Sequence, residues 1–220
     1  MDKDASIFPV QTVPQPTIAT EIHKGERDLI VLRYMARQVL TMAQQPDELA
    51  ATATMKQPLL YLLHERHNRS HRIALYQAKE SFLLPNLLFV GFISKKQAAL
   101  DAQIVGDIAD VDKKMLNELV EIPGLLSYSS LQFRNGNWCN LVLFREETAK
   151  THVRSSSTHS YAVYQLAPRY YEWIRLHNGR VEGGLAQGRL MLKRTHLYTF
   201  PIPHGKPNVQ ELTYSHKSSV

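Results

Sequence analysis

The feature that most constrains the fold is a pair of apolar runs on either side of Asn135-Gly136. The runs are LLSYSSLQF at residues 125–133 and NWCNLVLF at residues 137–144. Asn-Gly favours a tight turn between antiparallel strands, because both residues accept the positive φ angles that such a turn needs. The sequence therefore predicts a β-hairpin over residues 125–144.

Strand and helix patterns alternate around this hairpin. LLFVGFIS is short and apolar without a helical period, which predicts a buried strand at 87–94. The apolar residues of VDKKMLNELVEIPG share one helical face, and Pro123 ends that helix. Part of 146–167 is predicted as a second helix that ends before Pro168, and YYEWIRLH at 170–177 as a strand. This order predicts an α+β protein of the ferredoxin-like βαββαβ type, with helices on one face of an antiparallel sheet.

Further strands are predicted after this unit. A second Asn-Gly pair at 178–179 predicts another turn, and LMLKRTHLYTF at 190–200 predicts the final strand. GGLAQG at 183–188 lacks the spacing and the Lys-Ser/Thr pair of a phosphate-binding loop. We therefore interpret it as a loop between the last two strands.

The N-terminal part of the chain is predicted to be an extended arm followed by helices. Residues 1–20 contain three prolines and cannot sustain a helix. DLIVLRYMARQVLTMAQQ has apolar residues at spacings of three and four, with Asp28 as its N-cap and Pro46 after its end. LLYLLHERHNRSHRIALYQAKES at 59–81 is predicted as a second helix. The predicted divisions are the arm and helical extension at 1–85, the ferredoxin-like α+β barrel domain at 86–200 and a C-terminal tail at 201–220.

Three histidines of this second predicted helix, His64, His67 and His71, would share one helical face. Such a face could bind zinc, copper or nickel. Arg66 and Arg69 would oppose a bound cation, so we interpret the face as a solvated basic surface and predict no metal site.

The composition limits the function. The net charge of +6 is spread along the chain, whereas nucleic-acid-binding proteins usually concentrate it in a patch, so nucleic acid is not an expected partner. The single cysteine, Cys139, excludes an internal disulfide and fits a cytoplasmic protein. No apolar run reaches the ~18 residues of a transmembrane helix, and the acidic, proline-bearing N-terminus is unlike a signal peptide. We therefore expect no membrane partner.

Three stretches of the chain resemble a known superfamily: NWCNLVLF, the segment AKTHVRSSSTHSYAV and the tyrosine-rich strand that follows. Over residues 86–200 they resemble the dimeric α+β barrel superfamily, which includes antibiotic-biosynthesis and heme-degrading monooxygenases. The resemblance implies a cavity between the sheet and its helices, and a homodimer in which two sheets pack face to face. The N-terminal helices are the competing cover for that sheet face and would favour a monomer.

The resemblance also bears on cofactors. In heme-degrading members a histidine on the second helix ligates iron, and His152 best matches that position. Those members carry a tryptophan at the end of the preceding strand, where this chain has Phe144, with Trp138 at the other end of the strand. We expect no cofactor, with heme as the alternative.

His152 and His159 are the candidate catalytic bases. Seven residues are two helical turns, so both imidazoles would share one face of a continuous helix. The intervening SSST at 155–158 is more typical of a helix break with a new N-cap, which would make the two histidines independent.

The strand YYEWIRLH supplies the candidate ligand site. Its alternation puts two aromatic rings, a cation and an imidazole on one face, which suits an anionic aromatic ligand. A packed interface is the alternative interpretation of this face. The candidate ligand-binding residues are Trp138, Phe144, Tyr171, Trp173, Arg175 and His177.

These observations favour a protein that binds a small aromatic or polycyclic molecule, either simply holding it or oxidising it as a cofactor-independent monooxygenase-like enzyme. In the second case His152 or His159 would deprotonate the substrate. One alternative is an RNA-recognition module, because LFVGFI resembles the first-strand motif of that fold. The other is a non-catalytic accessory protein whose barrel serves dimerisation.

Overall fold

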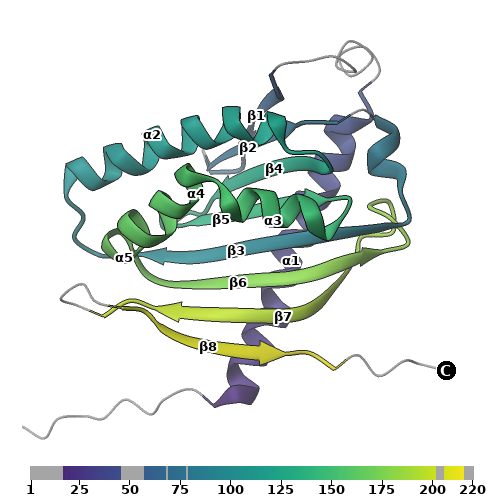
Figure 1. Cartoon of the computed structure of the whole chain (residues 1–220). Coiled ribbons are helices and arrows are strands. Elements are labelled where there is room, and N and C mark those ends of the chain that lie inside the picture. Colours follow the sequence, from purple (N-terminus) through teal and green to yellow (C-terminus); the bar gives the residue numbers. More distant parts are fainter. Residues whose placement is uncertain (1–16, 46–56, 68, 78, 202–205, 216–220) are drawn as a thin grey trace, which may run out of the picture.

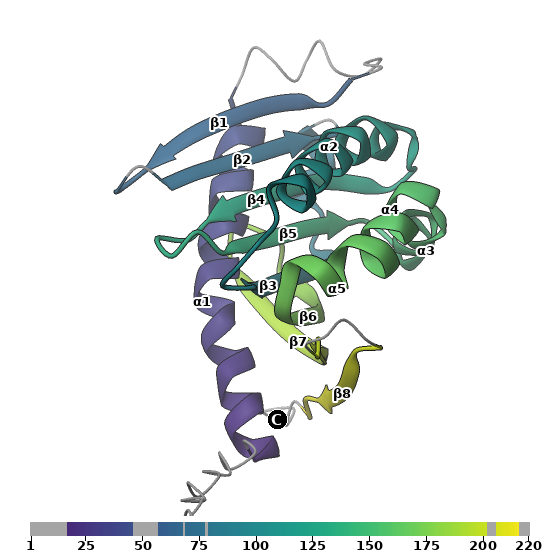
Figure 2. The same cartoon turned by 90° about the vertical axis from the view of Figure 1, so that its left-hand side faces the viewer.

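The computed structural model describes residues 17–45, 57–67, 69–77, 79–201 and 206–215 of the 220-residue chain. These residues form one eight-stranded sheet with helices on both faces (Figure 1). Helix α1 lies against one face, whereas α2, α3, α4 and α5 lie against the other (Figure 2). The fold is therefore of the α+β class.

Helices and strands follow one another along the chain in a mixed order. They are α1 (Ile18–Ala43), β1 (Leu59–Glu65), β2 (Arg69–Leu75), η2 (Lys79–Leu83), β3 (Asn86–Lys96), α2 (Ala102–Glu118), η3 (Leu119–Glu121), β4 (Leu125–Gln132), β5 (Trp138–Phe144), α3 (Glu147–Ser155), α4 (Ser157–Tyr161), the π-helical turn η4 (Ala162–Leu166), α5 (Ala167–Tyr170), β6 (Tyr171–Glu182), β7 (Arg189–Thr199) and β8 (Asn208–Thr213).

Neighbouring strands all run antiparallel, in the order β1-β2-β4-β5-β3-β6-β7-β8. The predicted hairpin at 125–144 is confirmed as β4–β5, with Gln132 opposite Trp138. Gly136 in its turn has a φ of 75°, which is the conformation that glycine adopts without a steric penalty. The strands predicted at 87–94 and 190–200 are confirmed as β3 and β7.

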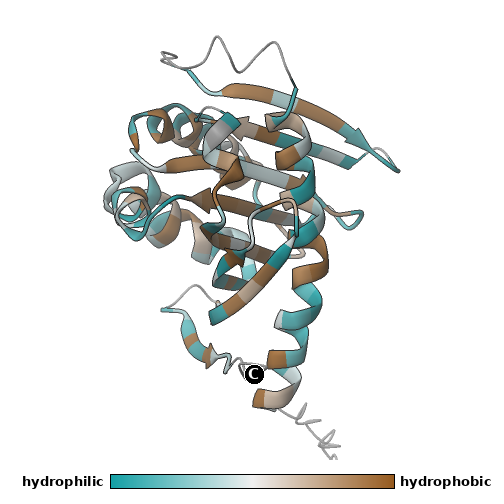
Figure 3. Ribbon diagram, turned by 90° about the vertical axis from the view of Figure 1, so that its right-hand side faces the viewer, coloured by the Kyte–Doolittle hydropathy of each residue, from teal (hydrophilic) through white to brown (hydrophobic). Residues whose placement is uncertain are grey.

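Helix α1 confirms the predicted N-terminal helix, but it begins at Ile18 rather than near Asp28. The hydroxyl of its N-cap, Thr17, accepts a hydrogen bond from the backbone N–H of Thr20. The turns of α1 alternate between hydrophobic and hydrophilic residues (Figure 3), as expected of a helix with one buried face. The α1 residues with no exposed surface are Leu32, Met35, Ala36, Val39 and Ala43.

The second helix predicted at 59–81 is wrong, because this segment forms the hairpin β1–β2 and the short helix η2. Leu59 and Leu63 of β1 pack against the core around α1, whereas Leu60 and Leu62 are exposed. Because apolar residues occupy both faces of β1, its period of two is hidden and the sequence fits a helix equally well. β2 pairs with β4, so the N-terminal hairpin extends the same sheet.

The histidines of this hairpin do not share a face. His71 is completely buried in β2, His64 is exposed opposite Ser70, and His67 lies in the turn between the strands with a φ of 64°. Within the described residues no group of three His, Cys, Asp or Glu side chains is arranged to hold a metal ion. The geometry that could have bound a metal on a helix is therefore not formed.

The turn predicted at 178–179 is also wrong, because β6 continues through Asn178-Gly179 to Glu182. At this pair the register of β6 shifts against β7. A Cβ atom on Gly179 would overlap the ring of Phe89 and the backbone oxygen of Met191, which explains the glycine without a turn. The connection between β6 and β7 is the predicted GGLAQG loop.

Two C-terminal details differ from expectation. The helical segment continues past Pro168, because Pro168 stands in the first turn of α5, where no backbone N–H is needed. The segment 201–220 contributes a strand, β8, which pairs with β7 along the edge of the sheet.

The predicted break between His152 and His159 is confirmed. Ser156 has an extended backbone (φ −62°, ψ 137°), and it both ends α3 and precedes α4. Its hydroxyl accepts a hydrogen bond from the backbone N–H of His159 at 3.2 Å. Among the described helices, none combines the length and apolarity needed to cross a membrane.

Candidate functional site

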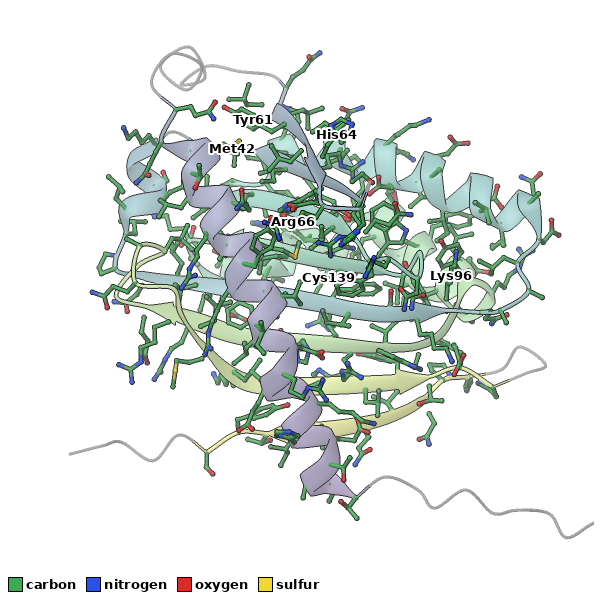
Figure 4. The ribbon with its side chains drawn as sticks, turned by 180° about the vertical axis from the view of Figure 1, so that it is seen from behind. Met42, Tyr61, His64, Arg66, Lys96 and Cys139 are labelled. Carbon is green, nitrogen blue, oxygen red and sulfur yellow. The ribbon has the colours of Figure 1, made fainter. Side chains whose placement is uncertain are left out.

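A groove of about 1110 Å³ lies on the sheet face that carries α1. We call it the α1 groove. Figure 4 shows this sheet face, with α1 in front of the strands. Residues from one side of α1 form one wall, and residues of the β1–β2 turn, β4, β6 and β7 form the rest. The volume is slightly above the roughly 300–1,000 Å³ that small-molecule sites occupy.

The geometry of α1 explains why this groove exists. The helix runs across the strands (Figure 1), and its 26 residues extend ~39 Å at 1.5 Å per residue, enough to span the eight strands. A helix is only about 10–12 Å in diameter, whereas strands of 11 residues such as β3 are ~37 Å long. One crossing helix therefore leaves the sheet beside it uncovered.

Asp28 of α1 ties the helix to β6 at one end of the groove. Its carboxylate accepts hydrogen bonds from Arg175 (Nε to Oδ2, 2.6 Å; Nη2 to Oδ1, 3.0 Å) and from His177 (Nε2 to Oδ2, 3.0 Å). Burial by itself raises the pKa of Asp28, but the bonds from His177 and Arg175 outweigh it and lower the pKa below its usual value. His177 is completely buried, and its Nδ1 lies within hydrogen-bond distance of the Thr195 hydroxyl, at 2.7 Å.

Glu65 holds α1 at a second point, Tyr34, in a similar way. Its Oε1 accepts a hydrogen bond from the hydroxyl of Tyr34 at 2.6 Å and one from Nδ1 of His71 at 3.0 Å. Nε2 of His71 lies 2.7 Å from the Oγ of Ser129. Burial and the Glu65 carboxylate raise the pKa of Tyr34 to about 12. Burial lowers the pKa of His71, against the opposing effect of Glu65.

Both networks join a carboxylate, an imidazole and a hydroxyl at distances found in nucleophilic catalysis. The hydroxyls of Ser129 and Thr195 belong to residues with no exposed surface, so neither can meet a ligand in the groove. The two networks are therefore best explained as fastenings that hold α1 to the sheet through Asp28 and Tyr34.

Some of the positively charged side chains that line the groove have a carboxylate partner and others do not. Lys24 pairs with Glu21 at 2.6 Å, and Arg175 pairs with Asp28. Arg27, Arg66 and Arg69 also line the groove, and within the described part of the chain none of them forms an ion pair. The surface of the groove is thus cationic.

Trp173 and Arg175 lie on one face of β6, as the alternation of the strand predicts, and their binding of a ligand stays a prediction. Both line the groove, and the guanidinium of Arg175 lies 4.4 Å from the centre of the Trp173 ring. His177 lies on the same face behind Asp28.

The prediction that Tyr171 shares this face is wrong. The register between β3 and β6 shifts at Lys95/Lys96, which turns Tyr171 to the opposite face. There its ring packs edge-on against Phe92 and Tyr170, with ring centres 5.4 and 4.8 Å apart.

Trp138 and Phe144 also lie away from the groove. Cys139 of β5 faces α1, with its sulfur 3.4 Å from that of Met35, so the alternating Trp138 and Phe144 face the helices. Phe144 is buried in a cluster with Leu116 of α2. The six predicted ligand-binding residues therefore divide between two faces of the sheet and do not form one site.

His152 and His159 border a hollow of about 160 Å³ beside Glu118. His152 is exposed, whereas burial, with a contribution from Arg154, lowers the pKa of His159. The space is below the roughly 300 Å³ of the smallest typical ligand pockets, and a heme does not fit it. A catalytic role for the two histidines stays a prediction.

The arrangement does not support the RNA-recognition alternative. Such a module presents aromatic rings on the sheet face opposite its helices. Here α1 covers that face, Phe89 of the LFVGFI motif is 1% exposed, and Trp138 and Phe144 point to the other side.

Sequence reasoning missed the residues that make the groove, above all Asp28, Tyr34, Glu65, Arg66 and Arg69. One signal was present. Asp28 stands one helical turn before Val31 and Leu32 on the apolar stripe of α1, where a charge needs a partner. Glu65 and its neighbours were hidden by the incorrect helix at 59–81.

Comparisons with known proteins give partial similarities only. No protein family matches the sequence, and no curated protein matches it. Among solved structures, protein SO0527 from Shewanella oneidensis has 9% identity and a TM-score of 0.38, over 44% of this chain and 92% of that one. A proposed monooxygenase from Fusobacterium nucleatum has 14% identity and a TM-score of 0.35, over 50% of this chain and 44% of that one.

A third solved structure, Rv0793 from Mycobacterium tuberculosis, has 11% identity and a TM-score of 0.32. The similarity covers 61% of this chain and 99% of that one. Likenesses as low as these three carry no argument about what this chain binds or does.

Proposed function

We propose that the protein binds a small anionic aromatic or polycyclic molecule in the α1 groove. The observation that carries this proposal is the combination, in one groove, of the rings of Tyr34 and Trp173 with arginines that lack a carboxylate partner among the described residues. Rings bind a planar ligand through stacking and apolar contact, and the cationic surface selects for negative charge.

Apolar side chains provide the rest of the contact surface. Ile30 on α1 is 69% exposed although it lines the groove, and Val31, Leu131 and Leu197 line it as well. A bound ring would remove this surface from water, at roughly 25 cal/mol per Å². The groove is therefore suited to a ligand with an extended apolar body and a charged end.

Calorimetric titration with 2-naphthoate tests the proposal. We expect saturable binding, and Trp173→Leu should weaken it roughly two- to tenfold, the equivalent of the ~0.5–1.5 kcal/mol of an aromatic contact. Trp138→Leu is the matched control, because it removes the other tryptophan of the chain from the opposite sheet face. Absence of binding, or equal losses in both variants, would reject the proposal.

Cofactor-independent oxygenation is a second form of this proposal. In that reaction a base removes a proton from the ligand, and the resulting anion transfers electrons to O₂. Glu65 lines the groove, and because its Oε1 accepts hydrogen bonds from Tyr34 and His71, its other oxygen, Oε2, would accept that proton. Oxygen consumption with 1,3-dihydroxynaphthalene that is lost in Glu65→Gln would support it. No consumption would leave binding as the function.

We also propose that β3, α2, β4, β5, the α3–α5 segment and β6 form a ferredoxin-like βαββαβ unit. The strand order β4-β5-β3-β6 and the position of these helices on one sheet face support it.

A homodimer stays a prediction. In a face-to-face dimer the two sheets would pack through the face that α1 occupies here. A homodimer of this chain would therefore use another surface. Light scattering of the purified chain measures the oligomeric state.

A further inference from the structure

We infer that the β1–β2 turn forms a binding site for a dianionic group of the phosphate-monoester class, so that the ligand of the α1 groove is an aromatic phosphate. This inference rests on the proposed function and assigns the charged end of the ligand to Arg66 and Arg69. Arg66 lies beside α1 on the groove side of the sheet (Figure 4).

Cations from two parts of the chain meet at the turn. Arg66 and Arg69 line the groove. Arg134 in the β4–β5 turn donates a hydrogen bond from Nη2 to Nδ1 of His67 at 3.1 Å, which joins the two turns.

The negative charge near this cluster is already engaged. Glu65 is adjacent in sequence to Arg66, but its Oε1 accepts hydrogen bonds from Tyr34 and His71. Considering the described residues alone, no carboxylate forms an ion pair with Arg66, Arg69 or Arg134. Three positive charges therefore stand against the one carboxylate of Glu65, which leaves a local excess that a monoanion would not balance.

The described residues of the turn are also held in place. The backbone of His67 is left-handed, with a φ of 64°, which is costly for a side chain with a Cβ and persists only where the surroundings enforce it. Nε of Arg69 donates a hydrogen bond to the backbone oxygen of Arg66 at 3.2 Å. Among the described residues no ion pair engages either guanidinium, and their planar fork matches a phosphate better than a lysine would.

Three naphthalene compounds with the same ring separate this inference from the proposed function. These are 2-naphthol, 2-naphthoate and 2-naphthyl phosphate, which carry about zero, one and two negative charges at pH 7.5. We expect calorimetric affinity to increase along this series, with the phosphate binding about tenfold or more tightly than the carboxylate. The preference should decrease with added salt, because the arginines are partly exposed.

The arginine variants complete the test. Arg66→Gln with Arg69→Gln should reduce the affinity for 2-naphthyl phosphate to that of 2-naphthoate and leave the affinity for 2-naphthol unchanged. Arg145→Gln removes an exposed arginine that does not line the groove, and it should keep the preference. The single variant Arg66→Gln gives the same comparison if the double variant does not fold.

The outcomes are distinguishable. Equal affinity for 2-naphthoate and 2-naphthyl phosphate, both above that for 2-naphthol, would overturn the inference and leave the proposed function intact. A preference for phosphate that survives in the arginine variants would do the same. Failure of all three compounds to bind would overturn both.

Discussion

The two faces of the sheet are covered in different ways, and the difference determines where a ligand can bind. On one face α2, α3, α4 and α5 form a layer whose side chains pack against Phe144, Tyr128 and Tyr171. The space left near His152 is about 160 Å³. On the other face a single helix crosses the strands and leaves a groove of about 1110 Å³. The face covered by a single helix thus has the room for a ligand.

The largest effect on this comparison is expected from Leu32→Ala. Leu32 has no exposed surface and packs against Gly91 in the middle of the sheet, so its loss leaves a cavity beneath α1. We expect a loss of about 2–5 kcal/mol in the free energy of unfolding, measured by urea denaturation. Ile30→Ala, two residues earlier on the exposed side of α1, should change stability by less than ~0.5 kcal/mol. Equal losses of stability in Leu32→Ala and Ile30→Ala would show that the buried face of α1 does not hold the helix on the sheet.

Asp28→Asn is expected to have the next largest effect. It removes the charge that Arg175 and His177 both contact, and we expect a loss of roughly 1.5–3 kcal/mol, the range for hydrogen bonds to charged groups. Because the folded protein lowers the pKa of Asp28, its contribution is complete above the unfolded value of 3.8 and is lost as the pH falls through the folded value. Urea denaturation between pH 2 and pH 7 should show a flatter acid limb in Asp28→Asn than in the unmodified chain.

A smaller effect concerns His71 at the other fastening. Its pKa is lowered by burial, so the stability it contributes is complete above the unfolded value of 6.5 and is lost as the pH falls toward the folded value. The slope from one such group is at most ~1.4 kcal/mol per pH unit. Urea titrations between pH 7 and pH 5 should show a reduced slope in His71→Gln. Ser129→Ala keeps the imidazole and should keep the slope, and a reduced slope in both variants would contradict the assignment to His71.

The smallest effect is expected from His152→Ala. His152 is exposed at the end of α3, on the face opposite the groove, so both stability and affinity for 2-naphthoate should remain within ~0.5 kcal/mol. Calorimetry and urea denaturation measure the two quantities. A substantial loss of affinity for 2-naphthoate would indicate that the ligand binds on the sheet face covered by α2, α3, α4 and α5.

Local patterns predicted much of this fold, because the Asn-Gly turn at Asn135-Gly136, the helix of α1 and the break at Ser156 depend on neighbouring residues. The errors arose where distant contacts decide. LLYLL in β1 is a strand because it pairs with β2. Asn178-Gly179 stays within β6 and does not form a turn, and Phe89 packs against Gly179 there.

The site depended still more on contacts between distant residues. Asp28 and Arg175 are 147 positions apart, and Tyr34 and Glu65 are 31 apart. Trp173 and Arg175 could be predicted because the alternation of a strand places them together, whereas a register shift at Lys95/Lys96 displaced Tyr171 from the same pattern. No periodicity within one segment indicates which side chains a crossing helix will meet.

The central claim is that the ligand binds beside α1, and the two tryptophans test it most directly because one lies on each face of the sheet. In protein labelled with 5-fluorotryptophan, fluorine NMR gives one resonance from each, assigned with Trp138→Phe and Trp173→Phe. On titration with 2-naphthoate we predict that the Trp173 resonance shifts to saturation while the Trp138 resonance stays in place. A shift of the Trp138 resonance with Trp173 unchanged would place the ligand between the sheet and its helices and contradict the account.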